Sequence, residues 1–240
     1  MPVHGRGLRA LSITTAIVLV ATYALTAFWT PEDADQGIIQ KIFYVHVPLA
    51  IVSLVGFIVG GLLAIQHLRT RDPIWDLRSY VAIHISLILG VAVLITGAIW
   101  AKTSWGVWFL WDEPTLVSFL IVFLLYGTYT PMRFAIEDRE RQARYASVFA
   151  ITAGAFVPIC FGAVRAQEQE VHPQTFGSGE LPGPMWLTFL VSLVAMAMLF
   201  YTLYRFEIAT KLARGRLRSL RRQLLDDDAP VLRRSAAPTI

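Results

Sequence analysis

The sequence predicts an all-α integral membrane protein with six transmembrane helices and with both the N and C termini in the cytoplasm. Three observations predict this fold class: an apolar composition, six long segments without charge, and basic residues gathered on one side. Hydrophobic residues make up 55% of the 240 positions, charged residues only 16%, and the mean hydropathy is +0.55. Soluble domains carry about 25% charged residues, so the composition excludes that class.

Six segments contain no Asp, Glu, Lys or Arg and are long enough to cross a bilayer. A helix needs about 20 apolar residues to span the hydrocarbon, and its backbone groups can be satisfied there only within the helix. The segments are 10–31, 42–68, 79–101, 114–132, 145–164 and 181–204. We therefore expect one transmembrane helix in each.

The first of these segments could also be a cleaved signal peptide, because Arg6 and Arg9 precede it. Its apolar run is longer than the 7–15 residues that are typical of a signal peptide. Removing the segment would also break the charge balance between the two sides of the membrane. We therefore expect a retained helix.

Basic residues are distributed unevenly between the two sides of the predicted bundle. An even number of spans puts both termini on one side. Of the 21 Lys and Arg residues, all but Lys41, Lys102 and Arg165 fall on that side. The positive-inside rule then predicts cytoplasmic termini. The net charge of +4 reflects this topology and contact with anionic membrane lipid, and it requires no nucleic acid.

Two regions are predicted along the chain. Residues 1–204 form the six-helix transmembrane domain, with an outward tryptophan-rich loop at 102–114. Residues 205–240 form a basic cytoplasmic juxtamembrane helix, which would lie on anionic lipid, followed by a disordered tail. Cys160 is the single cysteine, so an internal disulfide is excluded, and the sequence has no C-x-x-C-H motif for covalent haem attachment.

Two histidines are predicted on the outward side. His46 comes two residues before Pro48, where we expect the second helix to begin, because proline suits the first turn of a helix. This would place His46 just above the membrane. His172 lies in the third outward connection, in a polar setting.

The outward loop "SWGVWFLWDEP" places Trp105, Trp108 and Trp111 at intervals of three, with Phe109 between them. An aromatic belt at the lipid headgroups is the simpler interpretation, but this cluster is denser than a belt requires. Helical spacing would put Trp108 and Asp112 on one face. One of the two acids before Pro114 is expected to cap the fourth helix, which would be Asp112 or Glu113.

A wide aromatic surface near two histidines suits haem. The macrocycle stacks on aromatic rings, and the iron accepts imidazole at both axial positions. The two propionates would seek the outward cations, which are Lys41, Lys102 and Arg165. Zinc would accept two histidines and Asp112 but would not need the aromatic surface.

At these residues the chain resembles the CcmC (haem exporter protein C) family of cytochrome c maturation. "WGVWFLWD" is similar to the family's outer loop of the form W-G-x-W-W-x-W-D, with Gly106 at the glycine and Phe109 in place of one tryptophan. "KIFYVHVPLA" and "VHPQ" resemble the segments around the family's two outer histidines, which correspond to His46 and His172. The resemblance covers the topology from the first helix to the sixth.

The resemblance implies a haem-binding and transfer protein rather than an enzyme. It would act in the bacterial cytoplasmic (inner) membrane with its site on the periplasmic side, where His46 and His172 would be the axial ligands of a transiently bound haem b. Its partners would be the haem chaperone CcmE, the ABC-transporter subunits CcmA and CcmB, and CcmD. The other residues of the implied site are Trp105, Trp108, Trp111, Asp112, Phe109, Gly106, Lys102, Lys41 and Arg165.

Three alternatives stay open from the sequence. The chain could be a component of a haem–cytochrome c synthase, although its outer loops are short. It could be a b-type haem cytochrome that uses His67 and His84, which lie near the cytoplasmic ends of the second and third segments and could approach one another. A small-solute transporter is a third class, but no polar stripe or pair of broken helices supports it.

Overall fold

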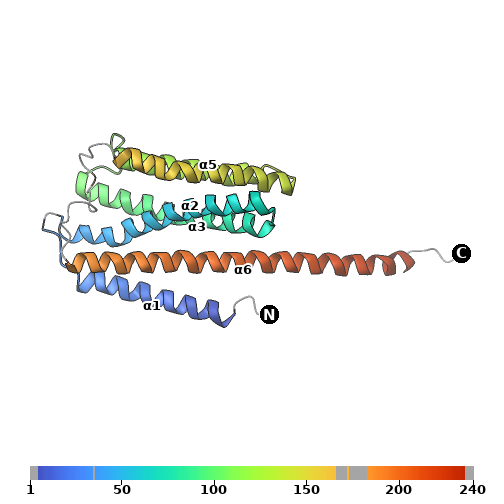
Figure 1. The fold of residues 1–240 in the computed structure, drawn as a ribbon. Coiled ribbons are helices and arrows are strands. Elements are labelled where there is room, and N and C mark those ends of the chain that lie inside the picture. The colour runs from blue at the N-terminus through green and yellow to red at the C-terminus, as the bar shows by residue number, and fades with distance from the viewer. Residues whose placement is uncertain (1–4, 35, 166–171, 173–182, 236–240) are drawn as a thin grey trace.

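The computed structural model describes residues 5–34, 36–165, 172 and 183–235. It contains six long helices that alternate in direction along the chain (Figure 1). All six are long and apolar enough to cross a membrane, which confirms the predicted number of spans. They are α1 (Arg6–Phe28), α2 (Phe43–Thr70), α3 (Pro73–Trp105), α4 (Pro114–Phe134), α5 (Arg139–Arg165) and α6 (Gly183–Ser235).

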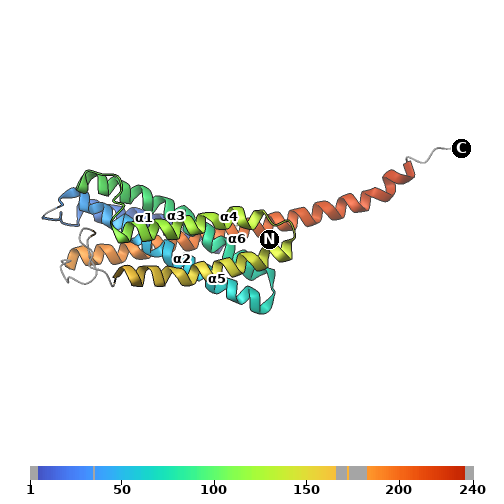
Figure 2. The ribbon, with the colours of Figure 1, turned by 90° about the horizontal axis from the view of Figure 1, so that it is seen from above.

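The alternating directions give the bundle two distinct ends. One end carries the connections at 29–42 and 106–113 and the start of α6, and we call it the tryptophan end. The opposite end carries the start of α1 and the connections at 71–72 and 135–138, and we call it the basic end. In Figures 1 and 2, α6 continues past the bundle at the basic end.

Helix α2 is central to the packing and contacts α3, α5 and α6. On one side α1 packs against α6, and on the other side α4 packs against α5 (Figures 1 and 2). The close crossing of α2 and α5 requires a glycine at position 61. A Cβ atom at Gly61 of α2 would lie 2.9 Å from the carbonyl oxygen of Ala150 in α5. Small residues let membrane helices approach in this way, and van der Waals contact then holds them together.

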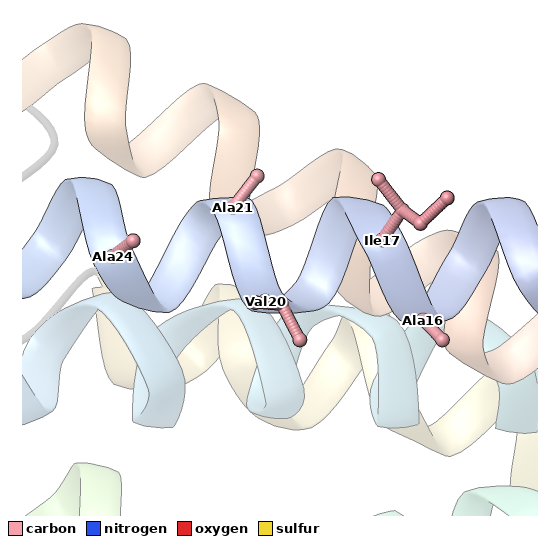
Figure 3. Close-up of a pocket in the computed structure, with 5 residues that line it drawn as sticks. All are labelled: Ala16, Ile17, Val20, Ala21 and Ala24. Carbon is pink, nitrogen blue, oxygen red and sulfur yellow. The ribbon is translucent and has the colours of Figure 1, made fainter.

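Two apolar hollows lie on the outside of the bundle. The first, of about 420 Å³, is formed by one stretch of α1 (Figure 3). The second, of about 410 Å³, lies between α4 and α5 and is lined by a few residues of each helix, among them Pro114 of α4 and Val164 of α5. Neither hollow is lined by His46 or His172. The lining of the first hollow is Ala16, Ile17, Val20, Ala21 and Ala24.

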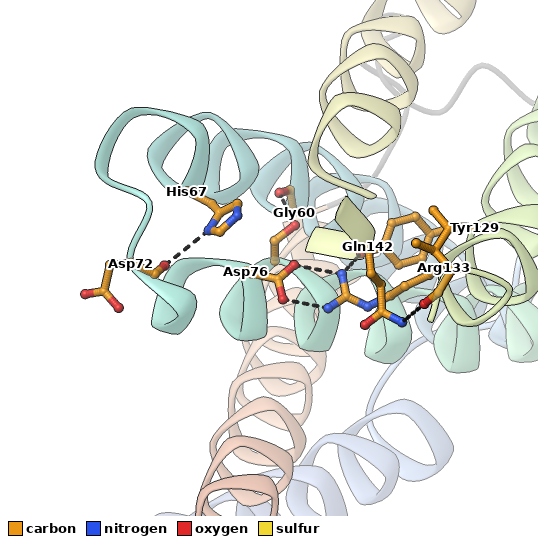
Figure 4. Close-up of polar contacts among 9 residues, drawn as sticks. Gly60, His67, Asp72, Asp76, Tyr129, Arg133 and Gln142 are labelled. Atoms are coloured by element: carbon orange, nitrogen blue, oxygen red, sulfur yellow. Dashed lines mark hydrogen bonds and ion pairs between the residues drawn. The ribbon is translucent and has the colours of Figure 1, made fainter. Parts of the chain in front are cut away.

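A buried ion pair joins α3 and α4 at the basic end (Figure 4). The guanidinium of Arg133 donates to both carboxylate oxygens of Asp76, over 2.7 and 2.6 Å, and also to the hydroxyl of Tyr129 over 3.2 Å. Asp76 lies in the first turn of α3 and Arg133 in the last turn of α4. Each charge therefore also complements the dipole of its own helix.

The start of α2 differs from the prediction. A 3₁₀ helix, η1 (Ile38–Ile42), runs directly into α2, so helical structure begins at Phe43 and Pro48 lies inside the helix. The prediction that the helix begins near Pro48 was wrong. Proline inside a helix forfeits one backbone hydrogen bond, and transmembrane helices tolerate that loss. His46 consequently lies in the first turn of α2 rather than before it.

The predicted juxtamembrane helix has no break that separates it from the sixth span. Helix α6 runs without interruption from Gly183 to Ser235. Gly215 is the single glycine between Arg205 and Leu225, and that stretch has no proline. Few residues there oppose helix formation, so the helix continues past the bundle. The last residues of the expected disordered tail, 236–240, lie outside the described residues.

Candidate functional site

His46 is held against α3 by its neighbours. Its Nδ1 atom lies 3.0 Å from the hydroxyl oxygen of Thr96. The Cε1 edge of the ring faces the helix backbone at Gly97, where a Cβ atom would come within 2.9 Å of the ring carbon Cε1. The His46 side chain is half-buried. Its position is therefore fixed by a hydrogen bond and by packing.

The structure brings His46 close to His172. The two side chains interact electrostatically, although one belongs to α2 and the other to the connection between α5 and α6. His172 is half-buried, and its sequence neighbours on both sides lie outside the described residues. Two imidazoles from distant parts of the chain therefore lie within electrostatic range of one another near the tryptophan end of the bundle.

The last turns of α3 carry the first part of the aromatic cluster. Trp105 is the final residue of α3, and its ring packs edge-on against Trp100 with 4.8 Å between the ring centres. Gly106 ends the helix with a φ angle of +77°, a conformation that favours glycine. The Trp100 indole also donates to the side chain of Gln36, over 3.3 Å. This contact joins the connection at 29–42 to α3.

The rest of the cluster lies on a non-helical loop, residues 106–113. The expectation that helical spacing would align Trp108 with Asp112 was therefore wrong, because Gly106 stops the helix first. Phe109 and Trp111 form a tilted pair 4.7 Å apart, while Trp108 and Trp111 are 61% and 74% exposed. The aromatic rings thus form two pairs, Trp100 with Trp105 and Phe109 with Trp111, and Trp108 belongs to neither of them, so the expected single flat slab is not formed.

The two acids of the loop have different environments. Glu113 is 4% exposed and is the N-cap of α4, where its carboxylate accepts a hydrogen bond from the backbone N–H of Thr115. Pro114 occupies the first position of that helix, as proline often does. This confirms that one of the two acids caps the fourth helix. Asp112 is exposed on the loop.

The structure describes the side chains of two of the three cations that the sequence predicts on the outward side. The amine of Lys102 donates to the Gly106 carbonyl over 2.7 Å and lies 5.9 Å from the centre of the Trp108 ring. The amine of Lys41 donates to the Ala27 carbonyl at the end of α1. Arg165 is the last residue of α5, and its side chain lies outside the described part of the chain. Both lysines therefore hold backbone at the tryptophan end.

The two histidines of the b-type alternative have different partners. The His67 ring lies 3.2 Å from the backbone carbonyl of Asp72 (Figure 4). His84 forms a 2.8 Å contact with the carboxylate of Glu207 on α6 and stacks on Tyr80. Both polar contacts are made by Nδ1, and they join each ring to a different part of the bundle.

Sequence reasoning missed three residues around the candidate site, which are Gln36, Thr96 and Gly97. The pair "TG" inside an apolar helix was the available signal, since small residues in membrane helices often mark a close approach. The sequence does not indicate which side chain makes that approach. Only the fold shows that it is His46.

The arrangement is better suited to a ligand with two axial positions than to a bare metal ion. Among the described residues, no group of three His, Cys, Asp or Glu side chains could hold a metal. The zinc site of two histidines and Asp112 is therefore not formed. The two imidazoles and the aromatic cluster lie at the same end of the bundle, and these are the kinds of group that haem uses, since its iron takes two imidazoles and its ring stacks on aromatic surfaces.

Comparison with known proteins agrees with this chemistry. Residues 1–223 match the family described as "Heme exporter protein C". The chain is 29% identical to the heme exporter protein C of Rhodobacter capsulatus over 224 residues, which is 92% of each protein. It is 30% identical to that of Paracoccus denitrificans over 217 residues, 87% of this chain and 88% of the relative. The chain therefore belongs to the heme exporter protein C family.

Proposed function

We propose that this chain binds haem at the tryptophan end, with His46 and His172 as axial ligands, and presents it to the haem chaperone CcmE. Membership of the heme exporter protein C family supports a role in haem handling during cytochrome c maturation. The haem is cargo, bound for transfer rather than kept as a resident cofactor. The cargo in this proposal is haem b.

The observation that supports the proposal is that His46 and His172 lie within electrostatic range of one another. They come from different elements of the bundle and interact electrostatically. Two imidazoles that occupy both axial positions would leave no open coordination site for oxygen. Such a site suits haem in transit, because the iron is shielded from side reactions until it is handed over.

The exposed tryptophans supply a surface for the porphyrin. Trp108 and Trp111 are the most exposed rings of the loop, and Trp105 anchors the loop to the end of α3. A porphyrin lying on these rings would be stabilised by stacking and by burial of apolar area. Lys102 is adjacent to Trp108, so its amine would attract a propionate in exchange for its contact with the Gly106 carbonyl.

The proposed location is the bacterial inner membrane, with the tryptophan end on the periplasmic side. The basic residues support this orientation, because Lys41, Lys102 and Arg165 are the only Lys and Arg residues assigned to the tryptophan end. The positive-inside rule then puts the basic end in the cytoplasm. CcmE would receive haem on the periplasmic side, and CcmA, CcmB and CcmD would complete the ABC-type system.

Visible spectroscopy of the purified chain tests the haem site. We expect protein from haem-replete membranes to show a low-spin bis-histidine spectrum. His46→Ala and His172→Ala should each lose or alter that spectrum. His67→Ala and His84→Ala are the matched controls, because they remove imidazoles at the basic end and should leave it unchanged. A spectrum that responds to the controls instead would refute the proposal and favour a b-type cytochrome.

Transfer is tested separately, by mixing the haem-loaded chain with haem-free CcmE in detergent. We expect haem to appear on CcmE with the wild-type chain and not with His46→Ala. If the chain binds haem through both histidines but CcmE never acquires it, the binding site stands and the handover role fails.

A further inference from the structure

We propose that Thr96 is a positioning residue that sets the tautomer of His46, so that Nε2 is the nitrogen presented to haem iron. This inference rests on the proposed function. It concerns the hydrogen bond made by the other ring nitrogen, Nδ1, which the structure describes directly.

The Thr96 hydroxyl has acceptors on its own helix. It lies 2.8 Å from the carbonyl oxygen of Ala92 and 3.2 Å from that of Val93, in the preceding turn of α3. A threonine in a helix commonly donates to such carbonyls. A hydroxyl has one proton, so a hydroxyl that donates to its helix can only accept from His46. We therefore assign the proton in the 3.0 Å contact to Nδ1 of His46. With the proton on Nδ1 of the neutral imidazole, Nε2 carries the free lone pair.

Gly97 gives the His46 ring access to Thr96. A Cβ atom at this position would lie 2.9 Å from Cε1, 3.6 Å from Nδ1 and 3.7 Å from Nε2. The Cε1 edge of the ring therefore faces the helix backbone at Gly97, where a side chain would displace it. Thr96 and Gly97 together set both the tautomer and the orientation of the ring. Metal-binding histidines usually have their second nitrogen fixed in this way, which also raises the basicity of the ligand.

The test compares two substitutions at position 96 with a distant control. Thr96→Val keeps the shape and removes the hydroxyl, and Thr96→Ser restores a hydroxyl. The control is Thr152→Val on α5, which removes an exposed hydroxyl that donates to Val148 at a similar distance of 3.1 Å. Haem dissociation to a scavenger is followed by visible absorbance. We expect about 10- to 100-fold faster loss for Thr96→Val, near-normal loss for Thr96→Ser, and no change for Thr152→Val.

A second measurement uses the haem-free protein and detects a tautomer rather than a loss of stability. Nitrogen NMR of histidine-labelled protein distinguishes protonated from unprotonated ring nitrogens, and the His46 signals are assigned by their loss in His46→Ala. We expect the proton on Nδ1 in the wild type and in Thr96→Ser. In Thr96→Val the preference for Nδ1 should weaken.

The outcomes separate this inference from the proposed function. If His46→Ala loses haem while Thr96→Val retains it at the wild-type rate, the positioning role is refuted and the haem site stands. A proton found on Nε2 of wild-type His46 refutes it equally. If His46→Ala itself holds haem normally, the proposed function fails, and this inference fails with it.

Discussion

Replacing Asp76 with alanine would leave the Arg133 guanidinium without its carboxylate partner inside the bundle. The side chain of Arg133 is 8% exposed and that of Asp76 is 15% exposed, so water cannot readily replace the lost contacts. The hydroxyl of Tyr129 and the ring of Tyr80, 5.1 Å from the guanidinium carbon, would be its remaining partners. Breaking one side of a buried pair costs about 3–5 kcal/mol, and we expect a loss of this order for Asp76→Ala.

The loss is measured by unfolding the chain in detergent and following its circular dichroism. An exposed pair in the same protein provides the control. Arg144 and Glu140 form a 3.0 Å contact within α5, and their side chains are 52% and 79% exposed. Pairs of this kind contribute about 0.3–0.5 kcal/mol, so Glu140→Ala should change stability very little.

The double variant Asp76→Ala/Arg133→Met sharpens the test. It removes both charges, so no unpaired charge is left in the bundle. We therefore expect it to be more stable than Asp76→Ala alone, since buried pairs can often be replaced by apolar side chains at little cost. If Asp76→Ala is no more destabilising than Glu140→Ala, the pair does not stabilise the bundle and the reasoning is refuted.

Three further predictions concern packing and capping, and each is checked by the same unfolding measurement. Gly61→Leu should destabilise the protein by about 1–3 kcal/mol, because its side chain would press on the backbone of α5, whereas Gly162→Leu, where a Cβ meets open space, should be mild. Thr15→Val should cost roughly 0.6 kcal/mol, because the 2.8 Å hydrogen bond to Thr202 joins α1 to α6. Glu113→Ala should cost about 1 kcal/mol through the lost helix cap, and an unchanged stability would exclude a capping role.

The number of helices and most of their limits could be predicted from the sequence, because charged residues mark where each span leaves the membrane. Arg71 and Asp72 separate α2 from α3, and Asp112 and Glu113 precede α4. The start of α2 could not be predicted in this way. Pro48 indicates a helix start by its local preference, but the preceding 3₁₀ turn had already begun the helix.

The candidate site was predictable as a set of residues but not as a geometry. The histidines at 46 and 172 and the tryptophan-rich loop stand out by residue type. The geometry depends on contacts between elements that are distant in sequence, such as the one between His46 and Thr96. The arrangement of the aromatic rings depended on one local feature, the positive φ angle of Gly106, which ends α3 before Trp108.

The exposed faces of Trp108 and Trp111 have an energetic consequence. An indole side chain presents up to about 250 Å², so exposures of 61% and 74% together amount to roughly 300 Å² of mainly apolar surface. Removing that area from water is worth on the order of 7 kcal/mol. Exposure of these two rings to water is therefore unfavourable, and a flat apolar molecule that covers them would remove this unfavourable exposure. If a second molecule covers the same rings as the first one leaves, the free energy that is lost on release is regained. Release of the first molecule is then less unfavourable than release into water alone.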